Sequence, residues 1–196
     1  MKQKIILASQ SKARSAILNS CGIRHVVMPS SVKEIHISSK KPQAIVMHNA
    51  GMKAEAIFRR VKNGVILGVD TLVLFKGKLI GKPRNKREAK KILREFSGNK
   101  ILVYSGLHVI DADSGSEAGG FDLTSLKIKK IPEKDIEKYF NLLGPYDKAG
   151  GFSIEGVGSI IFDDIKGSFY NVVGLPTGKL QELFQKIGLD LLDFVK

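Results

Sequence analysis

The 196-residue chain has little cysteine, no long hydrophobic stretch, and few acidic residues for its number of basic ones. Cys21 is the only cysteine, so no internal disulfide can form, and Cys/His zinc spacing is absent. Oxygen ligands are then the expected donors to any metal. The longest apolar run is interrupted at Asp70, short of the roughly 20 residues that a membrane-spanning helix needs. The N-terminal apolar segment is short, so we expect no signal peptide and a cytoplasmic protein.

Several familiar catalytic motifs are also missing. The four histidines, at positions 25, 36, 48 and 108, show no H-E-x-x-H spacing, and no G-x-S-x-G or G-x-G-x-x-G motif is present. Residues 77–82 spell G-x-x-x-G-K, which is one residue short of a Walker A loop and lacks its Ser/Thr. These absences argue against a zinc protease, a serine hydrolase with a nucleophile elbow, and a P-loop enzyme.

The charge balance is strongly basic. The chain has 32 Lys and Arg against 19 Asp and Glu, a net charge of +13, and a sequence pI near 9.8. Such a field attracts polyanions in general and does not choose among them. Much of the charge lies in residues 86–94, where the pattern predicts an amphipathic helix. No aromatic residues are interleaved with these charges, so a solvated basic face is favoured over a nucleic-acid groove.

Residues 65–83, VILGVDTLVLFKGKLIGKP, are the most informative stretch. The first part predicts a buried strand, yet Asp70 lies in its middle. A buried carboxylate costs several kcal/mol unless a cation or hydrogen-bond donors compensate it. The chain then turns at Lys76-Gly77 and returns to Lys82. A carboxylate and a lysine on one hairpin fit either a metal and phosphate site or a structural ion pair, and this hairpin alone leaves both open.

A second candidate site lies near the N-terminus. The pattern predicts a strand at residues 4–8, a polar loop, and a helix from Lys12 to Cys21 with Ser11 as its N-cap. Backbone N–H groups at the start of that helix, with Lys12 and Arg14, would suit a phosphate. A strand-helix junction with a serine cap and no ligand has the same pattern.

The rest of the chain predicts a single mixed α/β unit over residues 1–196, without repeat or linker. We expect Lys53, on the second helix, either to reach a pocket or to extend its ammonium to solvent. The remaining expected strands lie at residues 25–28, 101–111, 118–130, 159–162 and 169–173, and the remaining helices at 42–62, from Pro132 to Gly144-Pro145, and at 177–187.

Taken together, several blocks of sequence resemble the Maf family of nucleoside triphosphate pyrophosphatases, also described as septum-formation inhibitors. Their order and spacing make the resemblance specific, and it covers nearly the whole chain. The blocks are LASQSKAR (7–14), Glu34, Lys53-Ala54, GVDT (68–71), GKP (81–83), FSG (96–98), KAGGF (148–152), EGVGS (155–159) and VVGLP (172–176).

The resemblance implies an elongated α/β fold like that of inosine triphosphate pyrophosphatases, with a central mixed sheet flanked by helices and a cleft between two lobes. It implies hydrolysis of a nucleoside triphosphate to the monophosphate and pyrophosphate with a divalent metal, Mg²⁺, Mn²⁺ or Co²⁺. A homodimer is also implied, with no membrane partner, and nucleic acid is disfavoured as a partner. The alternative is a non-catalytic nucleotide- or nucleic-acid-binding regulator of cell division that uses the basic surface.

The resemblance also assigns roles to residues. Asp70 is implied as the proton acceptor, with Glu34 and Lys82 as further catalytic residues, and Asp70 and Glu34 as metal ligands. The implied substrate-binding residues are Ser9, Lys12, Arg14, Lys53, Thr71 and Glu155.

Two departures from the family pattern bear on activity. The family loop usually reads S-x-S-P-R-R, and here Lys12 and Ala13 replace Pro and the first Arg. One guanidinium fork is therefore lost, which predicts weaker turnover or an altered substrate. Glu155 and Phe152 resemble the 7-methylguanosine triphosphate group, whereas SFYNVVGLP at residues 168–176 resembles the pyrimidine group. The base preference stays open.

Overall fold

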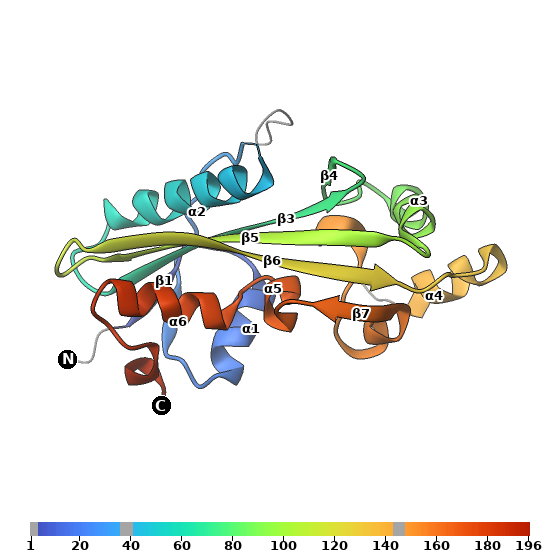
Figure 1. Ribbon diagram of the computed structural model, residues 1–196. Helices are drawn as coiled ribbons and strands as arrows, with labels where there is room; N and C mark the ends of the chain where they lie inside the picture. The colour runs from blue at the N-terminus through green and yellow to red at the C-terminus, as the bar shows by residue number, and fades with distance from the viewer. Residues whose placement is uncertain (1–3, 36–40, 143–147) are drawn as a thin grey trace. The chain divides into compact units, whose positions relative to one another are not determined.

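The computed structural model describes residues 4–35, 41–142 and 148–196, and Figure 1 labels its elements. The strands are β1 (Ile5–Leu7), β2 (His25–Val27), β3 (Val65–Phe75), β4 (Lys78–Ile80), β5 (Lys100–Asp111), β6 (Glu117–Ile128) and β7 (Phe162–Lys166). The α-helices are α1 (Lys12–Ser20), α2 (Pro42–Phe58), α3 (Lys86–Phe96), α4 (Ile136–Leu142), α5 (Phe169–Val173) and α6 (Thr177–Lys186). Short 3-10 helices are η1 (Glu133–Asp135), η2 (Ala149–Gly151), η3 (Gly156–Ile161) and η4 (Leu191–Phe194).

The strands of the described residues form one mixed sheet. Its order is β2-β1-β3-β5-β6-β7, and β4 pairs with β3. β1 is parallel to both β2 and β3, whereas β4 is antiparallel to β3 and β7 is antiparallel to β6. The sheet and its flanking helices confirm the predicted mixed α/β fold. No helix in the described part of the chain is long and apolar enough to cross a bilayer.

The chain divides into two compact units. The first consists of Met1–Asp70, Ser105–Asp122 and Gly174–Lys196, and the second of Thr71–Tyr104 and Leu123–Val173. In the first unit, α2 lies on one face of the sheet and α1 and α6 on the other (Figure 1). The assignment of residues 1–196 to a single domain stays a prediction.

The helices of the first unit begin where the sequence predicts. Ser11 caps α1, because its Oγ accepts the backbone N–H of Arg14 at 3.4 Å, and Gly22 follows the helix with a φ of 69°. Pro42 begins α2, as its fixed φ suits the first turn of a helix. This helix ends at Phe58 instead of continuing to Lys62.

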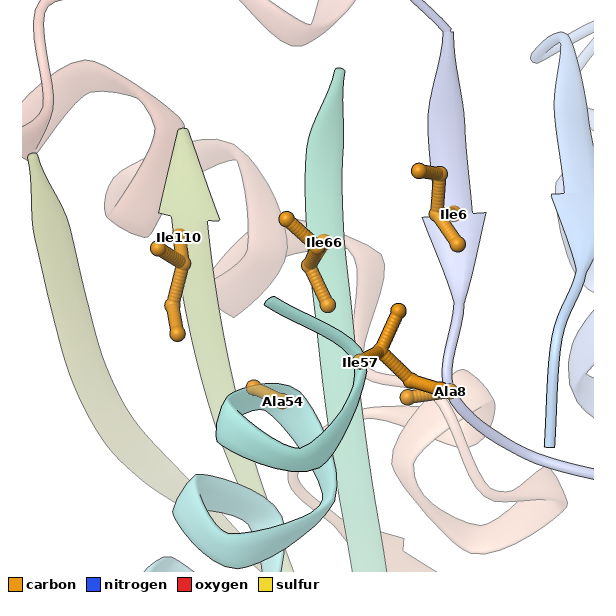
Figure 2. Close-up of a cluster of buried hydrophobic side chains, with 6 residues drawn as sticks. All are labelled: Ile6, Ala8, Ala54, Ile57, Ile66 and Ile110. Atoms are coloured by element: carbon orange, nitrogen blue, oxygen red, sulfur yellow. The ribbon is translucent and has the colours of Figure 1, made fainter. Parts of the chain in front are cut away.

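A cluster of aliphatic side chains joins α2 to the sheet in the first unit. Figure 2 shows Ala54 and Ile57 of α2 beside the side chains of the sheet and of Ala8, which follows β1. All members are at most 2% exposed, and they are Ile6, Ala8, Ala54, Ile57, Ile66 and Ile110. Burial of this surface contributes roughly 25 cal/mol for each Å² of apolar area removed from water. The cluster holds α2 against β1, β3 and β5.

Glycines let α2 approach the sheet closely. A Cβ on Gly68 in β3 would lie 2.1 Å from the Ala50 carbonyl oxygen, and one on Gly106 in β5 would lie 2.3 Å from that of Val46. No side chain fits at either place. Gly68 lies two residues before Asp70, so both point to the face of β3 that α2 covers. The close approach therefore brings the side chains of α2 within reach of Asp70.

In the second unit, local signals again match the structure. Lys76 and Gly77 have φ values of 46° and 76°, which is the pattern of a type I′ hairpin turn between β3 and β4. Asn85 caps α3, because its Oδ1 accepts the Glu88 N–H at 2.9 Å. The helix expected from Pro132 is η1 followed by α4. Its expected end at Gly144-Pro145 lies outside the described residues.

Two predicted strands are wrong. Residues 156–161 form the 3-10 helix η3, so the strand begins only at Phe162, and Phe169–Val173 is the helix α5. The β-branched residues of both segments favour strand, but local hydrogen bonds override that weak preference. Ser168 Oγ accepts the Asn171 N–H at 3.2 Å and so begins α5. Ser159 Oγ donates to the Gly156 carbonyl at 2.8 Å within η3.

The packing of α2 on β3 predicts the effect of a single methyl group. Gly68→Ala should lower the free energy of unfolding by about 3 kcal/mol, because the helix must move outward to admit the Cβ. Urea unfolding measures this change. Gly178→Ala, on α6, is the control, since its Cβ would meet nothing within 4 Å, and its stability should equal that of the parent or rise by up to about 1 kcal/mol. Equal stability of the two variants would contradict this account of the packing.

Candidate active site

The buried carboxylate of Asp70 is the centre of the candidate site. The residue lies in β3 and is 3% exposed. Its Oδ1 accepts a hydrogen bond from Lys53 Nζ at 2.8 Å, and its Oδ2 accepts one from Asn49 Nδ2 at 2.8 Å. Each carboxylate oxygen therefore has its own donor. This confirms the expectation that a cation or a hydrogen-bond donor compensates the charge of Asp70.

Lys53 joins Asp70 to a second carboxylate. Its ammonium lies 2.6 Å from Glu34 Oε1 and also donates to the Val69 carbonyl at 3.1 Å. Together with Asp70, these acceptors match the three N–H donors of an ammonium group. The Lys53 side chain is 8% exposed, so it is a buried bridge and not a solvent-directed lysine.

Asn49 is a residue of the site that the sequence reasoning missed. It is fully buried, and its Oδ1 accepts the Ile35 backbone N–H at 2.9 Å. Its Nδ2 donates to the Ile35 carbonyl at 3.1 Å as well as to Asp70. The available signal was its spacing: Asn49 precedes Lys53 by four residues, so both occupy one face of α2, among apolar neighbours.

The loop between β1 and α1 completes the site in the first unit. Leu7 lies beside Leu67 in the parallel pair of β1 and β3, so the loop that follows β1 begins next to the residues that follow Leu67 in β3. Arg14 Nη1 donates to Ser9 Oγ at 2.9 Å and to the Val69 carbonyl at 3.1 Å, and its Nε donates to the Gly174 carbonyl at 2.9 Å. Ser9 Oγ also accepts the Ser11 N–H at 3.2 Å. These bonds fix the guanidinium beside the middle of β3, next to Asp70.

Electrostatics couple Arg14 to the two acids. Burial lowers the pKa of the Arg14 guanidinium below its usual value, while the negative charges of Asp70 and Glu34 act in the opposite direction. An arginine nevertheless keeps its charge at any physiological pH. Two cations, Arg14 and Lys53, therefore face two carboxylates. Such a group can attract a polyphosphate and a divalent cation together.

The donor set also fits a hard divalent metal. Glu34 and Asp70 converge on one ammonium, which shows that their oxygens share a region where positive charge is favoured. Each carboxylate has about four acceptor positions, so one bond to Lys53 does not exhaust it. Mg²⁺ is usually held by one or two carboxylates with substrate phosphates and water. The described residues contain no group of three or more Asp, Glu, His or Cys placed to hold a metal.

The remaining predicted residues are Lys12, Thr71, Lys82 and Glu155. Lys12 is exposed in the first turn of α1 and lines a surface pocket together with Gln10, Ser11, Ser15 and Asn19. Thr71, Lys82 and Glu155 belong to the second unit. Lys82 is exposed, and Glu155 Oε2 lies 3.2 Å from Lys148 Nζ. Their roles in substrate binding and catalysis stay predictions.

Comparison with known proteins identifies the class. A family model described as "Maf-like protein" matches residues 4–187. The chain therefore belongs to the Maf-like family, as the blocks of sequence predicted.

Individual relatives extend this result. The dTTP/UTP pyrophosphatase of Caldicellulosiruptor saccharolyticus is 37% identical over 194 residues, covering 97% of this chain and 98% of the relative. The protein of the same name from Dictyoglomus thermophilum is 35% identical, with coverage of 98% and 100%. That of Methanosarcina barkeri is 35% identical, with coverage of 97% and 98%. Among solved structures, the Staphylococcus aureus Ham1 protein matches with a TM-score of 0.43 and 12% identity over 64% of this chain and 72% of its own.

The shared lysine predicts how stability responds to substitution. Lys53→Met should lower the free energy of unfolding by about 3 kcal/mol, because Asp70 loses its buried cationic partner. Adding Asp70→Asn should recover part of that loss, since the charge that needs Lys53 is gone. Urea unfolding of both single variants and of the double variant gives the interaction free energy between Lys53 and Asp70. Arg59→Met is the control: its side chain is 75% exposed, so the change should stay within about 0.5 kcal/mol. If the two substitutions changed the free energy of unfolding additively, the result would contradict a stabilising interaction between Lys53 and Asp70.

Proposed function

We propose that this chain hydrolyses a nucleoside triphosphate to the monophosphate and pyrophosphate with the help of a divalent metal. The observation that carries the proposal is the buried Asp70 carboxylate, held at both oxygens and joined through Lys53 to Glu34. The names of the full-length relatives support the same reaction class.

Asp70 acts as the proton acceptor in this proposal. A water molecule attacks the α-phosphorus, the bond from that phosphorus to the bridging oxygen breaks, and pyrophosphate leaves. The carboxylate takes the proton that the attacking water gives up. Lys53 and Asn49 hold that carboxylate in one orientation, so little reorganisation accompanies the proton transfer.

The cations offset charge on the phosphates. Arg14 and Lys53 lie beside the middle of β3, with their directions set by backbone carbonyls. We assign Ser9 and Lys12 to the triphosphate loop, and Lys82 and Thr71 to the same substrate. Glu34 and Asp70 would hold the metal, which when bound withdraws charge from phosphate oxygens. Lys12 carries a point charge beside Ala13, where the family usually has a guanidinium fork, so it binds phosphate with less directional preference.

The relatives favour dTTP and UTP as the substrates to test first. Glu155 sets the contrasting expectation of a 7-methylguanosine nucleotide, because a carboxylate accepts the paired donors of a guanine edge. In the structure Glu155 lies beside Lys148, with a Nζ to Oε2 distance of 3.2 Å. Because Lys148 already pairs with Glu155, the presence of this carboxylate does not decide between a pyrimidine and a guanine base. A homodimer stays a prediction.

No observation favours the non-catalytic alternative. On α3, Lys90 is paired with Glu137, and Arg94 Nε lies 2.7 Å from Glu133 Oε1. Part of the basic face is therefore neutralised by neighbouring acids, which reduces its attraction for nucleic acid.

Pyrophosphate release tests the proposed reaction. With Mg²⁺, Mn²⁺ or Co²⁺, the chain should release pyrophosphate from at least one of dTTP, UTP and 7-methylguanosine triphosphate. Asp70→Asn should lower kcat at least about 100-fold, because the proton acceptor is lost. Glu55→Gln, an exposed change elsewhere on α2, should leave kcat within twofold. An unaffected Asp70→Asn variant, or no release from any nucleotide, would refute the proposal.

Removal of metal provides a separate prediction. Dialysis against EDTA should reduce pyrophosphate release to background, and added Mg²⁺ should restore it, because without the metal two carboxylates add negative charge beside the triphosphate. The rate before chelation, after chelation and after re-addition is the measurement. Full pyrophosphate release in excess EDTA would show that the reaction needs no divalent metal.

A further inference from the structure

We propose that Asn49 is a positioning residue that ties the segment carrying Glu34 to the Asp70 carboxylate. The inference rests on the proposed function, since it assigns a role within the same site. It follows from three hydrogen bonds of one buried side chain, which join two parts of the chain that are far apart in sequence.

The side-chain amide of Asn49 forms hydrogen bonds both to the segment that carries Glu34 and to Asp70 in β3. Toward the segment, it pairs with both backbone groups of Ile35, accepting the N–H at 2.9 Å and donating to the carbonyl at 3.1 Å. Toward the strand, its second N–H donates to Asp70 Oδ2 at 2.8 Å. The orientation of the amide is determined by its neighbours, because a carboxylate only accepts and a backbone N–H only donates. No other side chain of this size offers one acceptor and two donors in this arrangement.

Asn49 and Lys53 repeat the same connection one helical turn apart. Asn49 joins Ile35 to Asp70 Oδ2, and Lys53 joins Glu34 to Asp70 Oδ1. Both side chains lie on the face of α2 that packs against β3. The helix thus holds the two acids at a fixed separation through two parallel bridges.

The segment needs such an anchor. Ser31 has a φ of 55°, a left-handed conformation that residues other than glycine rarely adopt. Residues 28–35 contain no helix or strand, and the Glu34 side chain is 40% exposed. Regular secondary structure therefore does not place Glu34, whereas Asn49 binds the backbone of the next residue from a fully buried position. A residue in this position acts on the metal and substrate through Glu34 and Asp70, and partners of this kind typically change affinity or activity 10–100-fold.

The test compares two buried asparagines. Asn49→Ala removes the proposed anchor, and Asn171→Ala is the matched control. Asn171 is likewise fully buried, and its Nδ2 donates to the Val103 carbonyl at 3.1 Å and to Thr124 Oγ1 at 2.9 Å, in the second unit. Both variants lose buried hydrogen bonds, so the comparison corrects for a general loss of stability. Asn49→Gln serves as a second variant that keeps the amide but displaces it by one methylene, in case Asn49→Ala does not fold.

Two readouts decide the proposal. Trypsin cleavage after the exposed Lys33, followed by mass spectrometry, should be about tenfold faster in Asn49→Ala than in Asn171→Ala. The kcat for pyrophosphate release should fall at least tenfold in Asn49→Ala, with KM changed less than threefold, and stay within twofold in Asn171→Ala. Equal behaviour of the two alanine variants in either readout would overturn the positioning role.

The failure of the proposed function is distinguishable from the failure of this inference. If the parent chain releases no pyrophosphate, the proposed reaction is wrong, and Mn²⁺ titration followed by electron paramagnetic resonance replaces kcat. Asn49→Ala should then weaken Mn²⁺ binding about tenfold relative to Asn171→Ala, together with the faster cleavage after Lys33. Cleavage and Mn²⁺ binding that match those of Asn171→Ala would overturn the anchor.

Discussion

The compensation of one buried negative charge organises the first unit. Asp70 lies within an otherwise apolar strand, and moving a carboxylate out of water costs several kcal/mol unless its neighbours supply donors. Lys53 and Asn49 supply one donor to each oxygen, from adjacent turns of one helix. The requirement is geometric as well as electrostatic, because both donors must reach a strand that lies beneath the helix. Gly68 meets it because it has no side chain at the point where the backbone of α2 comes closest to β3.

An ion pair of this kind is weak evidence for stability, because well-packed apolar residues often replace it at no cost. Its presence is better explained by chemistry. The same ammonium contacts Glu34, and a guanidinium with fixed direction ends beside the same strand. Two acids and two cations gathered beside the middle of β3 suit the proposed binding of a polyanion together with a hard cation. The family membership and the names of the relatives agree with that chemistry.

Much of this architecture could be predicted from the sequence. The caps at Ser11 and Asn85 and the Lys76-Gly77 turn are local signals, and they place α1, α3 and the hairpin correctly. Asp70 was recognisable because an acid within an apolar run needs a partner. Lys53 was identified only together with the family resemblance, since an isolated lysine on a helix has an ordinary solvent-exposed alternative.

Other features depend on contacts that sequence does not reveal. The segments around Ile160 and Val172 have strand-like composition, yet both are helical. The Ser159 hydroxyl donates a hydrogen bond within the first segment, and the Ser168 hydroxyl accepts one at the start of the second. Asn49 was missed because its role depends on Ile35, fourteen residues away, which no periodic pattern connects to it.

The most direct test of the central claim is a crystal structure with Mn²⁺ and a non-hydrolysable nucleoside triphosphate analogue, with the metal located by anomalous scattering. The account predicts Mn²⁺ within ligand distance of the carboxylates of Asp70 and Glu34 and in contact with the phosphates. A metal and triphosphate bound elsewhere, with Asp70 still enclosed by Lys53 and Asn49, would contradict it.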